Sequence, residues 1–488
     1  MYKAQSFRQM TFNDFNQSCG MQLSKDDEWC VLAGRIDWDV AETMYSENFK
    51  SGKGHPAAPV RQALGALIIQ KRMRLSDREL VKAIAENPYY QYFIGLPAFS
   101  QKCPFTYSAL PGFRKRITVE LINSVNEAFL AKAGPTPEHA KAAGRKGTNG
   151  LAQAENADAE NAGTMILDAT CSPSNIRYPQ DFSLLNEARE KTDSIIDQLH
   201  AQVNPMGVRH PRTYREVLHK AYLGIAKAKR RPANKVRALV RKLLCALKRN
   251  LGFIDALVAQ GGMLTRQQTG QLDTIRELYR QQKEMFDAGT HRVDRRIVSI
   301  SQPHVRPVVR GKAKSPVEFG AKYDVSIDEK GHGRLEKQSF EPYNESGVFK
   351  DAVERYRERT GHYPKRALVD QIYRTKANRD FCKEHGIAMA GRGPGRPSKS
   401  ARERQKADNA NETDRIEVER FFSRDKRTCG AALIVTKLEQ TSLASIALSV
   451  FVANLLGIPA TGFFVLYFLD LPESAKKWHF MEFSGGVA

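Results

Sequence analysis

Cysteine is scarce in this sequence, with seven residues among 488, and no two of them form a C-x-x-C pair. Scattered single cysteines argue against a disulfide framework and against a cysteine-based zinc site. They are typical of reduced thiols, and the polar N-terminal stretch MYKAQSFRQM lacks the pattern of a signal peptide. These absences predict a cytoplasmic protein.

Negative charge is also in short supply, because 54 Asp and Glu residues stand against 76 Lys and Arg residues. The net charge of +22 favours a polyanionic partner, nucleic acid before a membrane surface. Hydrophobic residues make up 41% of the chain, which excludes a disordered protein. The length predicts about two to four domains.

Long uncharged runs are rare, and the one at residues 440–469 is long enough to be considered as a membrane span. Gly457 and Pro459 interrupt it, and serines and an asparagine are spread through its first half. We therefore predict a buried helix of about 16 residues, then a turn and a short strand, with no membrane partner.

Residues 55–133, which follow an N-terminal segment at 1–54, have the apolar spacing of consecutive helices. The stretch SDRE, Ser76 to Glu79, fits a capping box that opens one helix, and Asn87-Pro88 ends it. This pattern predicts an all-helical N-terminal domain.

A third helix is predicted to start at Ser108, and its first turns carry Arg114, Lys115 and Arg116. Short basic helices in sequence suggest a helix-turn-helix DNA reader. A plain helical interaction domain remains the alternative. Residues 134–162 are rich in Ala, Gly and Asn without any period, which indicates a linker.

Long helical patterns fill residues 184–294, and the middle of this block is strongly basic. Between Arg209 and Arg249 the single acidic residue is Glu216. In VRALVRKLLCALKRNL the apolar residues share one helix face and the basic residues the other. A basic face is commonly only solvated, but this imbalance favours a track for DNA phosphates. The predicted phosphate contacts are Arg230, Arg231, Arg237, Arg241 and Lys242.

Residues 317–328 alternate between apolar and polar side chains, which predicts a strand with one face in the core and the other in water. GRLEKQSFEPY is a plausible hairpin partner for this strand. ESGVFKDAVERYRERTG then predicts an amphipathic helix that ends at Gly361.

Two further apolar strands are each followed directly by an aspartate. Met165 to Leu167 run into Asp168, and Ala367 to Val369 run into Asp370. A buried carboxylate is costly without compensation, and two brought together repel each other. A divalent cation resolves this conflict, and carboxylate oxygens suit Mg²⁺. The alternative for each residue is a satisfied core aspartate or a strand-end cap.

The stretch DRIEVERFFSRDKR offers a third acid. On a helical projection Arg415, Glu419 and Lys426 share one face, whereas Glu417 lies on the far side. The apolar flank that would dock on a sheet is formed by Val418, Phe421 and Phe422. Glu419 is therefore the candidate metal ligand, with a helical ion pair to Arg415 as the alternative.

Asp168, Asp370 and Glu419, the last within R-x3-E-x6-K, resemble the acidic triad of the insertion-sequence DDE transposases. RLSDRELVKAIAENPYYQYFIGL and FRKRI are similar to the N-terminal domain of the IS-five group. RIVSISQPHVRPVVRGKAKSPVEFGAKYDVS, GHYPKRALVDQIYRTKANRDFCKEHGI and GRGPGRPSK are similar to blocks of its catalytic domain. The resemblance extends over residues 55–455.

The resemblance implies an α/β fold with an RNase H-like core, a mixed five-stranded sheet flanked by helices. Residues 163–183 and 295–456 would form this core, and 184–294 would be a basic helical insertion after its first strand. The all-α domain at 55–133 would bind DNA, and 457–488 would be a C-terminal tail.

The resemblance also implies a transposase that cleaves DNA at the terminal inverted repeats of its own element and joins the 3′ ends to target DNA. Asp168, Asp370 and Glu419 would hold two Mg²⁺ ions, with Mn²⁺ as a substitute, and Arg415 and Lys426 would contact phosphates near the cut site. A homodimer bound to double-stranded DNA is expected, because the two ends of the element are handled together. The expected location is the bacterial cytoplasm, at the nucleoid.

One position departs from the family pattern, which has a Tyr three residues before the Arg where this chain has Glu412. The DNA contact of that tyrosine therefore has no counterpart here. GRGPGRPSKSARERQK, residues 391–406, is expected to be a mobile basic loop near the active site or a merely solvated one. Two other functions stay open: a DNA-binding regulator without catalysis, and an RNase H-like nuclease without strand transfer.

Overall fold

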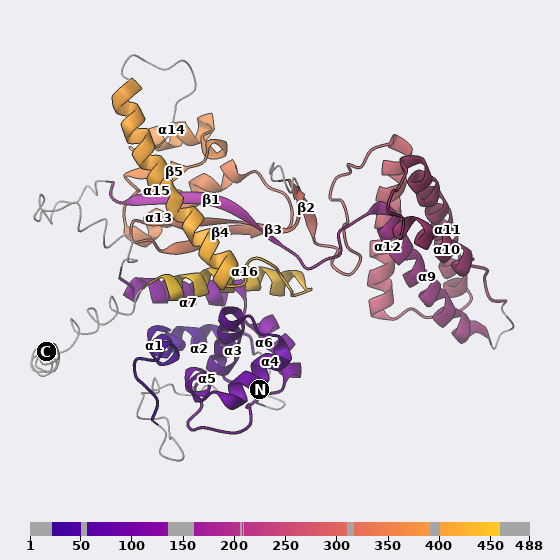
Figure 1. The fold of residues 1–488 in the computed structure, drawn as a ribbon, viewed down its shortest axis with the longest axis horizontal. Helices are drawn as coiled ribbons and strands as arrows, with labels where there is room; N and C mark the ends of the chain where they lie inside the picture. The colour runs from indigo at the N-terminus through magenta and orange to yellow at the C-terminus, as the bar shows by residue number, and fades with distance from the viewer. Residues whose placement is uncertain are drawn as a thin grey trace, which may run out of the picture.

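The computed structural model describes residues 22–49, 56–134, 161–204, 207, 209–309, 317–390 and 401–458, with the backbone alone for 401–410. Figure 1 shows an N-terminal group of helices packed below a β-sheet, and a separate helical bundle to one side. Buried apolar residues form one cluster shared by the first two parts and a second cluster inside the bundle.

The N-terminal unit is all helical, as predicted. Its elements are α1 (Glu28–Arg35), α2 (Trp38–Ser46), α3 (Val60–Met73), α4 (Asp77–Glu86), α5 (Pro88–Phe93), η2 (Tyr107–Ala109), α6 (Leu110–Arg116) and α7 (Val119–Lys132). The predicted capping box is present, since Ser76 and Glu79 bond to each other's backbone N–H. Because α1 and α2 share one core with α3 to α7, this unit begins before the expected boundary at residue 55.

The single helix predicted to start at Ser108 is wrong. The chain breaks between α6 and α7, where Thr118 is extended and its hydroxyl accepts from the backbone N–H of Leu121. Threonine favours such a cap over a helix interior, because its β-branched side chain is restricted within a helix and its oxygen satisfies an otherwise unpaired N–H.

One mixed sheet of six strands forms the centre of the chain. The strands are β1 (Thr164–Pro173), β2 (Arg306–Val309), β3 (Val317–Ile327), β4 (Gly333–Ser339), β5 (Arg366–Val369) and β6 (Ala388–Met389). Their order is β2-β3-β1-β5-β6, with β4 also paired to β3. The expected number was five, but β3 is long enough to pair with β2 through its first residues and with β4 through its last.

Helices cover both faces of the sheet. The elements are η4 (Glu345–Val348), α13 (Phe349–Thr360), η5 (Gln371–Tyr373), α14 (Lys376–Glu384), α15 (Ala401–Thr428) and α16 (Glu439–Gly457). Side chains of α13 pack with Met165, Leu167 and Val369 on one face, whereas those of α15 and α16 pack with Ile166 and Leu368 on the other. The predicted end of α13 is confirmed, because Gly361 follows it with a φ of 81°.

Two further expectations need correction. The face of β3 that was expected in water is covered, since Asp324 is fully buried and Ser326 nearly so. The basic stretch 391–406 is not all loop, because α15 begins at Ala401. Residues 391–400 lie outside the described residues, as does most of the expected linker at 134–162.

The block expected at 184–294 is a bundle of α9 (Asp181–Val203), α10 (Arg215–Ala226), α11 (Ala233–Ala259) and α12 (Arg266–Ala288). It follows β1, and Figure 1 shows it reaching the sheet through two connecting segments. The predicted apolar face of α11 is buried within it, Leu243 and Leu247 completely. Its polar face points outward, as an amphipathic helix on a bundle requires.

Helix α16 is long and apolar enough to cross a membrane by composition alone, but 72% of its apolar window is buried inside the protein. It packs against α7 and β4, as well as α15. The predicted buried helix is therefore confirmed, and the turn and strand expected after it lie outside the described residues.

A polar contact fastens the N-terminal unit to the sheet. Asn454 of α16 accepts from the backbone N–H of Gly333 at 2.9 Å and donates to its carbonyl at 2.7 Å. Its amide also donates to Asn126 of α7 at 2.9 Å. A buried asparagine is stable here because its donors and acceptor are paired.

Replacing Asn454 by Leu should lower the free energy of unfolding by roughly 2–4 kcal/mol, because the N–H of Gly333 and the amide oxygen of Asn126 lose their side-chain partner and the carbonyl of Gly333 keeps only the 3.4 Å bond from Asn126. Thermal unfolding of the full chain measures this. Gln440→Ala, at an exposed position in the first turn of α16, is the matched control. Equal unfolding midpoints for both variants would contradict the assignment.

Candidate functional site

The first two predicted acids lie side by side at the sheet. Strands β1 and β5 are parallel, with Leu167 paired to Val369, so that Asp168 and Asp370 follow as neighbours. Leu167 and Val369 point into the cluster under α13, and side chains alternate along a strand. Asp168 and Asp370 therefore belong to the opposite face, which α15 covers.

The carboxyl group of Asp168 is strained electrostatically. Its pKa is raised to about 6, mainly by burial and to a smaller extent by the charges of Asp370 and Glu345. The backbone N–H of Ala169 and the guanidinium of Arg415 act in the opposite direction. Only about a fifth of the Asp168 side chain is exposed, so water screens these charges poorly.

Helix α15 packs across this face of the sheet, and the helix face that was predicted to carry the functional residues is the one turned toward β1. Arg415 Nη1 lies 4.0 Å from Asp168 Oδ2, and Lys426 Nζ donates to Thr170 Oγ1 at 2.7 Å. Glu419 lies between them on the same side of the helix and is exposed. The apolar flank predicted to dock, Val418, Phe421 and Phe422, is buried.

The donor set suits a divalent cation. Two carboxylates lie on adjacent strands, burial disfavours the charge of Asp168, and hard cations prefer carboxylate oxygens. Among the side chains that the structure describes, no three His, Cys, Asp or Glu residues converge closely enough to form a complete ligand group. Asp168 and Asp370 are thus brought together, whereas Glu419 faces the solvent beside them.

Glu412, at the position where the family pattern has Tyr, contacts this site indirectly. Its carboxylate lies 3.2 Å from Arg415 Nη2, and it is the first of the charges that raise the pKa of Arg415. The same guanidinium faces Asp168 and Asp370, which also raise its pKa. Glu412 therefore holds Arg415 rather than presenting an aromatic ring.

A buried acid that no sequence pattern singled out lies on the other side of α15. Asp425 is fully buried and accepts from Tyr323 Oη at 2.6 Å. Burial raises its pKa to about 6, and the nearby ammonium of Lys71 from α3 opposes this shift. Lys71 in turn has its pKa lowered to about 8 by burial. The i+7 spacing of Asp425 from Val418, on the docked side of the helix, was the available signal.

This acid should make stability depend on pH. Because the pKa of Asp425 is higher in the folded chain than in the unfolded chain, its contribution is full below about pH 4 and is lost as the pH rises through about 6. The loss should amount to at most about 3 kcal/mol. Asp425→Asn imitates the protonated form, so its unfolding midpoint should fall less than that of the wild type between pH 4.5 and 7.

Thermal unfolding at several pH values measures this difference. Asp351→Asn, on the exposed side of α13, serves as the control and should keep the wild-type profile. A parallel pH profile for Asp425→Asn and the wild type would show that Asp425 does not titrate in this range.

Of the basic residues of the N-terminal unit that were predicted to contact DNA, two already interact with other side chains of the protein. Arg114 pairs with Asp77 and donates to Gln70 at 2.9 Å. The guanidinium of Arg116 lies over the ring of Phe49 at 5.2 Å. Lys115 is exposed between them. Arg114 therefore contributes to packing between α3, α4 and α6.

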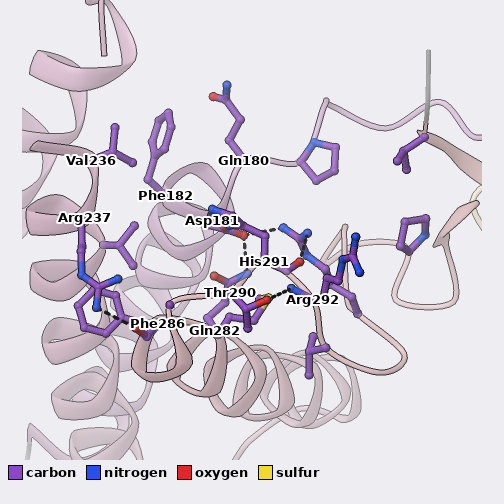
Figure 2. A pocket seen from close by; sticks show the side chains of 18 of the residues that line it. Gln180, Asp181, Phe182, Val236, Arg237, Gln282, Phe286, Thr290, His291 and Arg292 are labelled. Atoms are coloured by element: carbon purple, nitrogen blue, oxygen red, sulfur yellow. Dashed lines mark hydrogen bonds and ion pairs between the residues drawn. The ribbon is translucent and has the colours of Figure 1, made fainter. Parts of the chain in front are cut away.

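A cavity of about 1180 Å³ lies where the bundle joins the rest of the chain, and Figure 2 shows its lining residues. Asp181 at the start of α9 accepts from Gln282 of α12 at 3.0 Å and from Arg296 at 2.7 Å. His291 bonds to its other oxygen at 3.0 Å. The carboxylate of Asp181 thus connects the start of the bundle's first helix to the end of its last helix and the segment that follows.

Two of the five predicted phosphate contacts are used in interactions within the protein near this cavity. Arg237 lies 4.4 Å from the ring centre of Phe286 and donates to its carbonyl, as Figure 2 shows. Arg231 donates to Gln180 and Ala226. The other three predicted contacts, Arg230, Arg241 and Lys242, are exposed. Within the described ranges these three form no ion pair.

Comparison with known proteins gives two family matches. Residues 367–456 match the family described as "Transposase DDE domain", and residues 17–116 match "Transposase domain (DUF772)". The first range contains Asp370, Glu419 and the helix that presents it. The "Uncharacterized protein ORF8 in nfe locus" of Rhizobium meliloti is 26% identical over 196 residues, 40% of this chain and 78% of that protein. No solved structure matches.

Proposed function

We propose that this chain, a member of the insertion-sequence DDE transposases, binds the terminal inverted repeats of its own element, cuts DNA there and joins the 3′ ends to target DNA. The observation that carries the proposal is the pairing of Asp168 with Asp370 on the sheet face that α15 covers. DNA substrates follow from the family, and the reaction sequence is the proposal.

The topology of the sheet supports an RNase H-like core. Strand β1 lies in the middle, with β3 antiparallel on one side and β5 parallel on the other. The two acids come from these central strands, and α15 packs across them. The bundle α9–α12 follows directly after β1, and this position supports the insertion that the resemblance implies for residues 184–294.

The residues divide the chemistry between them. Asp168, Asp370 and Glu419 would hold two Mg²⁺ ions, or Mn²⁺, which activate the attacking water or 3′-hydroxyl and stabilise the leaving oxygen. Arg415 and Lys426 reach the same strand and would bind phosphates beside the cut site. No covalent protein intermediate is required.

DNA cleavage tests this proposal. Labelled duplex with the ends that flank the gene should be cut with Mg²⁺ or Mn²⁺ but not with EDTA. Asp168→Asn and Glu419→Gln should each reduce cutting at least about 100-fold, since each removes a metal-ligand charge, while DNA binding is kept. Asp380→Asn, exposed on α14, is the matched control and should cut normally.

The outcomes separate the alternative functions. Cutting together with transfer of the 3′ end to a second duplex supports the transposase. Cutting without transfer would favour a nuclease, and binding without cutting would favour a DNA-binding regulator. A homodimer is part of the proposal, because both ends must be joined in one complex.

The bundle is proposed to hold the DNA through exposed basic residues of α11 and of the segment just before it. Arg230→Gln, Arg241→Gln and Lys242→Gln together should lower the slope of log affinity against log salt by about 2–3, because each phosphate contact contributes about 0.9. Fluorescence anisotropy on end duplex at several salt concentrations measures the slope.

The matched control lies on α12 of the same bundle. Arg276, Arg280 and Lys283 are each paired with acids at distances of 3.0 Å or less, so their charges are already neutralised. Changing these three to Gln should leave the slope nearly unchanged. Equal slopes for the two triple variants would exclude Arg230, Arg241 and Lys242 from the DNA interface.

A further inference from the structure

Another carboxylate is buried on the opposite face of the sheet from the paired acids. Asp324 of β3 is fully buried and is paired in register with Ala169, the residue after Asp168. Because side chains alternate, Asp324 points to the face opposite Asp168. No step of the proposed reaction uses it, although a buried charge is costly without partners.

Two tyrosine hydroxyls compensate this carboxylate. Tyr373 donates to Asp324 Oδ1 at 2.7 Å, and Tyr343 donates to Oδ2. The two tyrosines come from different parts of the chain. Tyr343 follows β4, whereas Tyr373 ends η5, the short turn that follows β5.

Tyr373 reaches Asp324 across a strand. Strand β1 lies between β5 and β3 in the sheet, so a side chain that follows β5 must pass over β1 to meet β3. The residue of β1 at that point is Ala169. Its side chain is a single methyl group, which is small enough for a tyrosine ring to pass over the strand.

The turn fixed in this way is the one that carries Asp370. Asp370 caps η5, since its carboxylate accepts from the backbone N–H of Gln371 at 2.7 Å. Its carbonyl accepts from the N–H of Tyr373 at 3.1 Å. The carbonyl of Tyr373 is held in turn by the amide of Asn378 at 2.8 Å. Moving the Tyr373 ring would therefore move Asp370.

We propose that Asp324 is a positioning residue: through the Tyr373 hydroxyl it anchors the η5 turn and sets Asp370 beside Asp168. Asp324 itself touches neither metal nor DNA, because it has no exposed surface. This inference rests on the proposed function, in which Asp168 and Asp370 share a divalent cation. Outer partners that orient metal ligands generally tune metal affinity.

Tyr373→Phe and Tyr343→Phe form a matched pair, since each removes one hydroxyl from the same buried carboxylate. Both should lose similar stability, but only Tyr373 is attached to the turn of Asp370. Titration of the full chain with Mn²⁺, followed by electron paramagnetic resonance, measures metal affinity without any DNA reaction. Tyr373→Phe should weaken Mn²⁺ binding about tenfold, and Tyr343→Phe less than about twofold.

Asp370→Asn provides the reference for loss of the site. If it weakens Mn²⁺ binding but Tyr373→Phe and Tyr343→Phe both bind like the wild type, the positioning role is wrong and the proposed metal site stands. If the wild type binds no Mn²⁺, or Asp370→Asn binds it unchanged, both proposals fall. Should Tyr373→Phe not fold, Asp324→Asn replaces it: weaker binding supports the role, and wild-type affinity overturns it.

Discussion

The parallel pairing of β1 with β5 is the constraint on which the rest of the site depends. It places Asp168 and Asp370 next to each other on one face of the sheet, where burial raises the pKa of Asp168 to about 6. Two adjacent carboxylates would otherwise separate or retain a proton. The surrounding elements hold them in place: η5 is anchored through Tyr373, and Arg415 approaches from α15.

Helix α15 connects this pair to the remainder of the molecule. One side of it meets β1 through Arg415 and Lys426, and its docked side buries Asp425 against Tyr323. Lys71 of the N-terminal unit contributes to the electrostatics of that same acid. The N-terminal helices, α15, α16 and one face of the sheet share one hydrophobic core, the other face has a cluster under α13, and the bundle has its own core. This division matches the proposed roles, in which the sheet carries the metal site and the bundle holds DNA.

Much of this arrangement could be predicted from the sequence, because its signals are local. The alternation of residues 317–327 gave β3, the capping box gave α4, and the helical spacing of Arg415, Glu419 and Lys426 gave the side of α15 that faces β1. The features that were missed depend on packing between distant segments. Asp324 was expected in water, and its burial depends on Tyr343 and Tyr373, which reach it from other parts of the chain.

Packing between distant segments also explains why some of the basic residues predicted to bind DNA are not free to do so. Arg114 and Arg237 belong to runs that suggest DNA contacts, but Asp77 and Phe286, far away in sequence, use them inside the protein. Charge composition predicts a partner class for a surface, and tertiary contacts decide which side chains remain for it.

The most direct measurement is a crystal structure of the full chain soaked in Mn²⁺, with anomalous difference density to locate the ions. The account predicts density between the carboxylates of Asp168 and Asp370, with Glu419 turned toward it. Density absent from this position in crystals that contain Mn²⁺ elsewhere would contradict the account, and the pairing of the two acids would then need a purely structural explanation.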